Sequence, residues 1–139
     1  MFRRFPYLAT TGFRPTSPPT PEYNCIAWTA DEVDVWWWPD PDFMYFWPAQ
    51  VPRQETIEAF VQAYQTLGYE KCDNAELEFG YHKIAIYALF RKPTHAAKQL
   101  PSGKWSSKLG QNVDIEHDVI EGVCGPEYGS VEVIMRKPV

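Results

Sequence analysis

Positive charge is scarce in this chain of 139 residues. Its 13 lysines and arginines stand against 18 aspartates and glutamates, which gives a formal net charge of −5. Only Arg3-Arg4 near the start and Arg136-Lys137 near the end form locally basic stretches. Proteins that bind nucleic acid neutralise phosphates with many basic side chains, so this composition argues against a broad phosphate-binding surface. We therefore expect no nucleic-acid partner.

Long apolar runs are lacking as well. A membrane-spanning helix needs roughly 18 or more consecutive apolar residues, and no segment approaches that length. The arginines near the start are not followed by the apolar run of about 7–15 residues that marks a secretory signal. We therefore expect a protein that does not enter the membrane and that is located in the cytoplasm.

Cysteine is sparse, and the three thiols are Cys25, Cys72 and Cys124. At least one of them stays unpaired even if the other two join. No Cys-x-x-Cys pair is present, so the sequence does not predict a structural zinc site. Free thiols are typical of a reducing compartment. We expect neither a metal nor another cofactor, and the sequence leaves the oligomeric state open.

Aromatic residues are abundant by contrast, at 16% of the chain. Each buried aromatic side chain removes about 150–250 Å² from water, so they can supply much of a small core. The length is that of one domain. The first 21 residues contain five prolines, and proline fixes φ and removes a backbone donor. We predict a proline-rich, extended arm over residues 1–21 and a single α+β domain over residues 22–139.

Helix signals occur at three places. Asn24 is a good N-cap, which predicts a short helix from Asn24 to Asp31 with Cys25 at its first position. Residues 54–67 carry an apolar stripe at helical spacing, and Gly68 follows it as a stop. Asp114 to Val123 is predicted as a helix with an acidic first turn. Between the first two helices, several prolines exclude a regular element and predict an aromatic loop from Trp36 to Trp47.

Strand signals dominate after residue 69. The β-rich run 83–90, the run 94–100 and the run 104–109 are separated by short turn segments rich in Pro, Gly and Ser. Short connections of this kind predict an antiparallel meander. Ser130 to Arg136 is predicted as a final strand. The expected architecture is a nucleophile helix near the N-terminus and a second, amphipathic helix, both packed on this small sheet.

Cys25 is the candidate nucleophile. A sulfur at the start of a helix faces unpaired backbone N–H groups and the positive end of the helix dipole, which lower the pKa of a thiol. A base is also required, and the histidines are His82, His95 and His117. We choose His95, because a strand can hold its ring against a helix N-terminus. A third group would orient that ring, and the candidates are Ser107, Asn112, Asp114 and His117.

Three segments resemble papain-like cysteine hydrolases of the NlpC and CHAP kind. The segment Tyr23-Asn24-Cys25-Ile26-Ala27-Trp28 resembles their nucleophile helix, and Thr94-His95-Ala96-Ala97 resembles their histidine strand. The run from Gly103 to Gly110 resembles the following strand, which supplies the third, polar residue. The resemblance implies a papain-like fold and a thiol peptidase or amidase activity. Residues 24–136 also resemble a set of small uncharacterised bacterial proteins of unknown function.

Two functions follow as hypotheses. The first is a thiol hydrolase or acyltransferase that acts on a peptide-like amide or ester substrate, with Cys25, His95, Ser107 and His117 as catalytic candidates. The second is a catalytically silent binding module, whose aromatic loop from Trp36 to Trp47 grips a protein partner. The residues expected to contact a substrate are Asn24, Trp28, Trp38, Trp47, Trp105 and Lys108.

Overall fold

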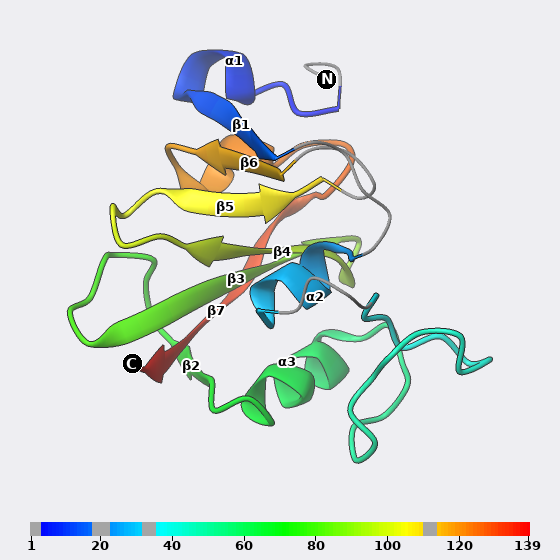
Figure 1. Cartoon of the computed structure of the whole chain (residues 1–139). Coiled ribbons are helices and arrows are strands. Elements are labelled where there is room, and N and C mark those ends of the chain that lie inside the picture. Colours follow the sequence, from blue (N-terminus) through cyan, green and yellow to red (C-terminus); the bar gives the residue numbers. More distant parts are fainter. Residues whose placement is uncertain (1–3, 18–22, 32–35, 110–113) are drawn as a thin grey trace.

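The computed structural model describes residues 4–17, 23–31, 36–109 and 114–139, and it has a mixed α+β fold dominated by a seven-stranded antiparallel sheet (Figure 1). The strands are β1 (Phe13–Ser17), β2 (Glu70–Cys72), β3 (Tyr81–Leu89), β4 (Lys92–Gln99), β5 (Trp105–Lys108), β6 (Asp114–His117) and β7 (Ser130–Pro138). The helices are α1 (Leu8–Thr11), α2 (Cys25–Thr29), α3 (Ile57–Gln65) and the 3-10 helix η1 (Ile120–Val123). Within the described residues, no helix has the length and apolarity needed to cross a membrane.

The sheet has the strand order β1-β6-β5-β4-β3-β7-β2. Strands β3, β4, β5 and β6 are neighbours both in the chain and in the sheet, so they form an antiparallel meander. The expected strands at 83–90, 94–100 and 104–109 are therefore confirmed, with bounds shifted by one or two residues. The expected final strand is also confirmed, and it inserts as β7 between β3 and β2.

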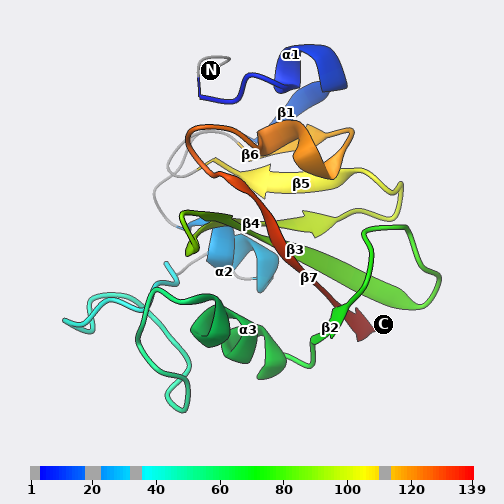
Figure 2. The ribbon, with the colours of Figure 1, turned by 180° about the vertical axis from the view of Figure 1, so that it is seen from behind.

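Alternation along β3 divides the core into two layers. Ile84 and Ile86 face the layer that contains α2 and α3, whereas Ala85 and Tyr87 face the layer that contains α1 and η1. Side chains point to opposite faces at successive strand positions, so both faces of β3 are apolar. The two views of the ribbon show α2 on one side of the sheet and η1 on the other (Figures 1 and 2).

Helix α3 forms where the apolar stripe predicts it. The hydroxyl of Thr56 accepts a hydrogen bond from Ala59 N at 3.1 Å and so caps the first turn. Phe60 and Tyr64 are fully buried on the side that faces the sheet. The edge of the Trp38 ring meets Phe60 at a centroid distance of 5.4 Å. This contact ties the aromatic loop to the body of the protein.

Two secondary-structure predictions are wrong, the second of them only in part. Residues 114–123 do not form a helix, because residues 114–117 pair with β1 and β5 as strand β6 and only 120–123 turn as η1. The arm departs from the expected extended form at residues 8–11, which form α1, whereas residues 13–17 are extended as the edge strand β1. Phe5 and Leu8 are buried in the second core layer, so burial of apolar side chains draws this segment onto the sheet.

Candidate active site

Cys25 begins helix α2, as predicted. The Asn24 side chain caps the helix by accepting a hydrogen bond from Ala27 N at 3.0 Å. The same amide binds the backbone of the aromatic loop, because its oxygen accepts from Trp37 N at 3.1 Å and its nitrogen donates to Trp37 O at 2.6 Å. One buried amide therefore fixes both the start of α2 and the aromatic loop around Cys25.

The sulfur of Cys25 lies where the pairing of β4 with β5 opens. Alternate N–H groups of a strand point the same way, and the N–H of Leu100 points to β5, where it donates to Lys104 O at 2.8 Å. The N–H of Ala96 faces the same side, but the residue pairing between the two strands ends at Lys98. The Ala96 N–H instead favours the thiolate of Cys25. Helix α2 thus places the thiol near the backbone of β4, one residue along the strand from His95.

The pKa of the Cys25 thiol is raised to about 11, because burial penalises the thiolate. The backbone N–H groups of Ala96, Ile26 and Cys25 lower the pKa, as does the charge of Lys108, but burial outweighs them. The expectation of a lowered thiol pKa at the helix start is therefore wrong in direction. At neutral pH the group is a thiol, and its proton must go to a base before or during attack.

Three of the predicted catalytic residues form one buried chain of hydrogen bonds. His95 Nε2 lies 2.9 Å from Ser107 Oγ, and Ser107 Oγ lies 2.8 Å from His117 Nε2. His117 Nδ1 lies 2.8 Å from the backbone oxygen of Val119. The side chains come from β4, β5 and β6, and all three are fully buried. Neighbouring strands of the meander therefore hold them in register.

The backbone carbonyl of Val119, at the end of this series of hydrogen bonds, determines which atom donates and which accepts in each of them. A carbonyl oxygen only accepts, so His117 Nδ1 carries the proton. Burial keeps both rings neutral, since it lowers the pKa of His117 to about 4 and that of His95 well below its usual range. His117 Nε2 then accepts from the Ser107 hydroxyl, and Ser107 Oγ accepts from the His95 Nε2–H. This assignment leaves His95 Nδ1 with a free lone pair.

His95 Nδ1 is buried and has no hydrogen-bond partner. Its ring lies on the face of the sheet opposite α2, where it stacks on Tyr128 at a centroid distance of 4.0 Å and an interplanar angle of 4°. The ring points toward β5, where its Nε2 reaches Ser107. In the described part of the chain no hydrogen bond joins Cys25 to a histidine ring. The thiol and the His95 imidazole therefore belong to opposite faces of the sheet.

An aromatic cavity of about 330 Å³ opens above the thiol. Cys25 contributes to its lining together with rings from the aromatic loop and from the loop before β7, namely Trp36, Trp38, Tyr45 and Tyr128. Arg4 and Glu127 also line it, and their ion pair has an N–O distance of 2.8 Å. A cavity of this size, mainly aromatic with a few polar groups, is typical of a small-ligand site.

Only two of the six expected substrate contacts, Asn24 and Trp38, line this cavity. Trp28 packs on the sheet instead, where its Nε1 donates to Ser106 Oγ at 3.1 Å. Trp47 lines a different cavity, and its Nε1 donates to a backbone oxygen at 3.0 Å. Trp105 and Lys108 are buried within β5.

Two other candidates for the third catalytic residue, Asp114 and Asn112, are not part of the histidine chain that the structure describes. Asp114 accepts a hydrogen bond from the Tyr23 hydroxyl at 2.6 Å on the face that carries α2. Asn112 lies outside the described residues. His82, the other histidine that we considered as the base, is exposed on β3. Within the described residues, no three side chains of His, Cys, Asp or Glu gather to hold a metal ion.

Tyr128 is one of the site residues that the sequence analysis missed, together with Arg4 and Glu127. Tyr128 belongs to a tight loop between η1 and β7, in which Gly129 has a φ of 76°. A Cβ at this glycine would lie 1.9 Å from Ala88 O, so only glycine lets the loop approach β3 this closely. The sequence feature that could have pointed to Tyr128 is an aromatic residue next to a glycine in a turn-like segment, Gly125-Pro126-Glu127-Tyr128-Gly129.

These features define a small α+β protein with a buried thiol, an adjacent histidine chain and an aromatic cavity. Residues 14–136 match the domain of unknown function DUF7689, and the chain belongs to that family. No curated protein and no solved structure matches the chain.

Proposed function

We propose that this protein is a papain-like thiol hydrolase or acyltransferase for amide or ester bonds. Cys25 is the nucleophile, and His95 Nδ1 is the base. The observation that carries the proposal is the hydrogen-bond chain from Val119 O through His117 and Ser107, which leaves His95 Nδ1 with a buried lone pair that has no hydrogen-bond partner. His95 directly precedes Ala96, whose backbone N–H favours the thiolate of Cys25. The placement of Cys25 at the start of a helix packed on an antiparallel meander supports the papain-like assignment.

The reaction begins with a neutral Cys25 thiol and a neutral His95 imidazole. The Cys25 sulfur attacks the carbonyl carbon of the substrate and forms a C–S bond, while its proton moves to His95 Nδ1. The resulting imidazolium returns that proton to the leaving nitrogen or oxygen as its bond to carbon breaks. Water, for hydrolysis, or another nucleophile, for transfer, then releases the acyl group from sulfur with His95 again as the base. The step therefore requires that the thiol and the His95 ring, which lie on opposite faces of β4 in the free protein, come together when substrate is bound.

Backbone donors surround the reacting sulfur. The N–H groups of Cys25, Ile26 and Ala96 all favour negative charge on this sulfur. Donors so placed can also stabilise the oxyanion that develops on the substrate carbonyl, and each such donor contributes about 2.7–4 kcal/mol in acyl-transfer enzymes. Asn24 supports this arrangement because it fixes the first turn of α2.

A binding module is the second candidate, and the state of the thiol favours it. Cys25 is buried, its pKa is raised, and it does not contact the His95 ring. A scaffold without turnover tolerates all three features. In that case the cavity beside the aromatic loop would hold a side chain of a protein partner, with Trp36, Trp38 and Tyr45 as the main contacts.

Transfer of an acetyl group from p-nitrophenyl acetate distinguishes the two functions. We expect intact-mass spectrometry to show one acetyl group on the wild-type protein, which peptide mapping places on Cys25. Cys25→Ala should remove the adduct, whereas Cys72→Ala and Cys124→Ala should keep it, because neither of those thiols lies in the cavity. An absent adduct together with no Cys25-dependent release of p-nitrophenolate would contradict the enzyme proposal, as would acetylation of either other thiol in place of Cys25.

A further inference from the structure

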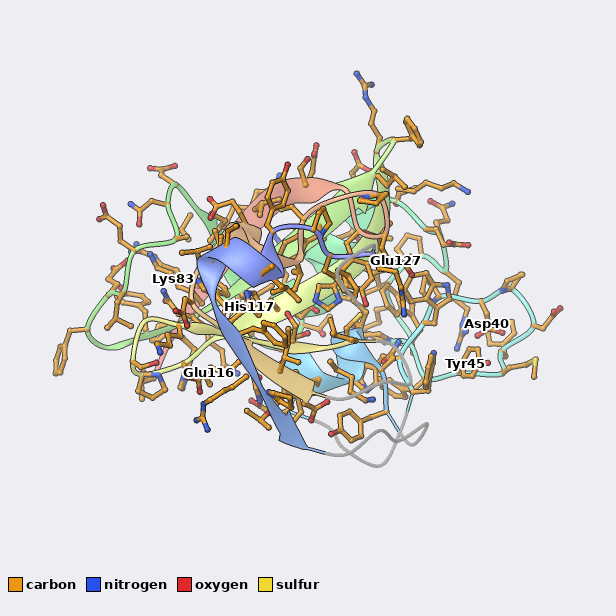
Figure 3. All side chains as sticks on the ribbon, turned by 90° about the horizontal axis from the view of Figure 1, so that it is seen from above. Asp40, Tyr45, Lys83, Glu116, His117 and Glu127 are labelled. Atoms are coloured by element: carbon orange, nitrogen blue, oxygen red, sulfur yellow. The ribbon has the colours of Figure 1, made fainter. Side chains whose placement is uncertain are left out.

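Four consecutive apolar residues are exposed at the end of the aromatic loop. The exposed fractions are 75% for Phe43, 74% for Met44, 40% for Tyr45 and 49% for Phe46. We call residues 43–46 the apolar tip. It belongs to the loop that extends beyond the edge of the sheet (Figure 1), and Figure 3 shows Tyr45 and Asp40 on that loop. Single exposed apolar residues are ordinary, but a contiguous group of them marks an interaction site.

The apolar tip is held in a fixed shape by polar contacts. The Asp40 carboxylate accepts from Met44 N at 2.8 Å and from Tyr45 N at 3.0 Å. The Arg53 guanidinium donates to Asp40 O at 2.9 Å and to Tyr45 O at 3.0 Å, and it lies over the Phe43 ring at 4.2 Å. These bonds preorganise the loop, which lowers the entropy cost of binding a partner.

The backbone at Phe43 is strained as well. Its φ is 55°, in the left-handed region that side chains other than glycine seldom adopt. Strain of this kind costs about 1–3 kcal/mol and persists where surrounding contacts impose it, often at functional sites. Here the strain accompanies the exposure of an aromatic ring rather than its burial. The contacts of Asp40 and Arg53 impose this conformation, which keeps the ring largely exposed.

Tyr45 connects the apolar tip to the candidate active site. It belongs to the tip, it lines the cavity above Cys25, and its ring lies 5.8 Å from that of Trp36. A long substrate whose reacting bond lies in the cavity would therefore extend from the cavity along the apolar tip. A small ester would fill the cavity alone, whereas a longer chain would reach both.

We propose that the apolar tip docks an apolar segment of a polypeptide substrate, next to the bond that enters the Cys25 cavity. This inference rests on the proposed function, and it identifies the substrate as a polypeptide chain rather than a small ester or amide. Charge disfavours the other large apolar partner, an anionic membrane. The net charge is −5, and Asp42 is exposed beside the tip, whereas membrane-binding loops carry Lys and Arg.

An array of 15-residue peptides, graded in apolar content, tests the proposal. The array is probed with the Cys25→Ala protein, which lacks the proposed nucleophile, so the experiment measures binding without turnover. We expect selective binding of peptides with an apolar segment. The double variant Phe43→Ser/Met44→Ser should weaken that binding about tenfold or more, as measured by fluorescence anisotropy on the best peptide. Tyr45 stays unchanged because it lines the cavity. Thermal unfolding of each variant establishes that it is folded.

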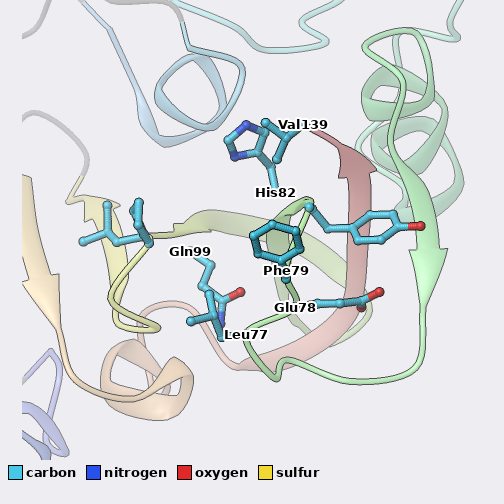
Figure 4. Close-up of a pocket in the computed structure, with 10 residues that line it drawn as sticks. Leu77, Glu78, Phe79, His82, Gln99 and Val139 are labelled. Atoms are coloured by element: carbon cyan, nitrogen blue, oxygen red, sulfur yellow. The ribbon is translucent and has the colours of Figure 1, made fainter.

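The matched control lies at the far end of β3. Leu77 and Phe79 are also exposed, and they line a separate cavity of about 570 Å³ with His82 and Val139 (Figure 4). Leu77→Ser/Phe79→Ser should leave peptide binding unchanged. Equal losses in both double variants, or no selective binding, would overturn the proposal. Binding to phosphatidylserine vesicles that requires Phe43 and Met44, without peptide binding, would also overturn it. Selective peptide binding without acetyl transfer to Cys25 would reject only the enzyme proposal.

Discussion

His95→Gln should slow acetyl transfer from p-nitrophenyl acetate to Cys25 by about 10²–10⁴-fold, the usual contribution of a positioned general base. The reason is the state of the thiol. Its pKa of about 11 leaves little thiolate at neutral pH, so attack depends on a group that removes the proton. Glutamine can still hydrogen-bond Ser107, but it supplies no basic nitrogen. The rate of p-nitrophenolate release at pH 7 measures the effect.

The control for this experiment is His82→Gln. His82 is exposed on β3, far along the strand from the residues that pair with His95. Its replacement should leave the rate unchanged. Equal rates for wild type and His95→Gln would show that the lone pair on Nδ1 takes no part in the reaction. The function would then be that of the binding module.

The stability of the protein should fall steeply between pH 6.5 and pH 4. His117 has a pKa of about 4 in the folded protein against 6.5 for the unfolded chain, because burial disfavours its charge. The unfolded chain therefore binds more protons in this window, so the free energy of unfolding decreases as the pH falls. The shift corresponds to a loss on the order of 3 kcal/mol for His117. His95, whose pKa is also lowered by burial, adds to the loss.

Urea unfolding at a series of pH values measures this loss. The variant His117→Asn, if folded, should show a shallower dependence between pH 6.5 and pH 4, whereas His82→Gln should keep the wild-type dependence. The carboxyls of Glu78 and Asp40, whose pKa values are lowered, act only at the acidic end of this window and below it. A free energy of unfolding that stays constant from pH 7 to pH 4 would mean that the histidines are solvated, and the tautomer assignment would then fail.

Local signals in the sequence were sufficient for much of the fold. The N-cap at Asn24, the stripe on α3 and the short turns of the meander each act within a few residues. The structure confirms all three. Residues 114–117 were misassigned because their acidic side chains also suit a helix start. One of their pairing partners, β1, lies near the other end of the chain, and single-sequence patterns do not show such long-range pairing.

The candidate site was predictable in part. The positions of Cys25 and His95 follow from local patterns, and Ser107 was one of several candidates on the following strand. The sequence could not show that Ser107 bridges His95 and His117 by hydrogen bonds, because that arrangement depends on the register of β4, β5 and β6. It also gave the wrong direction for the thiol pKa, because the effect of burial depends on how α2 packs against the sheet.

Alkylation of Cys25 by iodoacetamide as a function of pH tests the central claim most directly, with wild type and His95→Gln compared. The account predicts alkylation of the wild type at neutral pH, because His95 removes the proton, and a rate in His95→Gln that becomes appreciable only as the pH approaches about 11. Profiles that coincide for the two proteins, or labelling that requires unfolding, would contradict the pairing of Cys25 with His95.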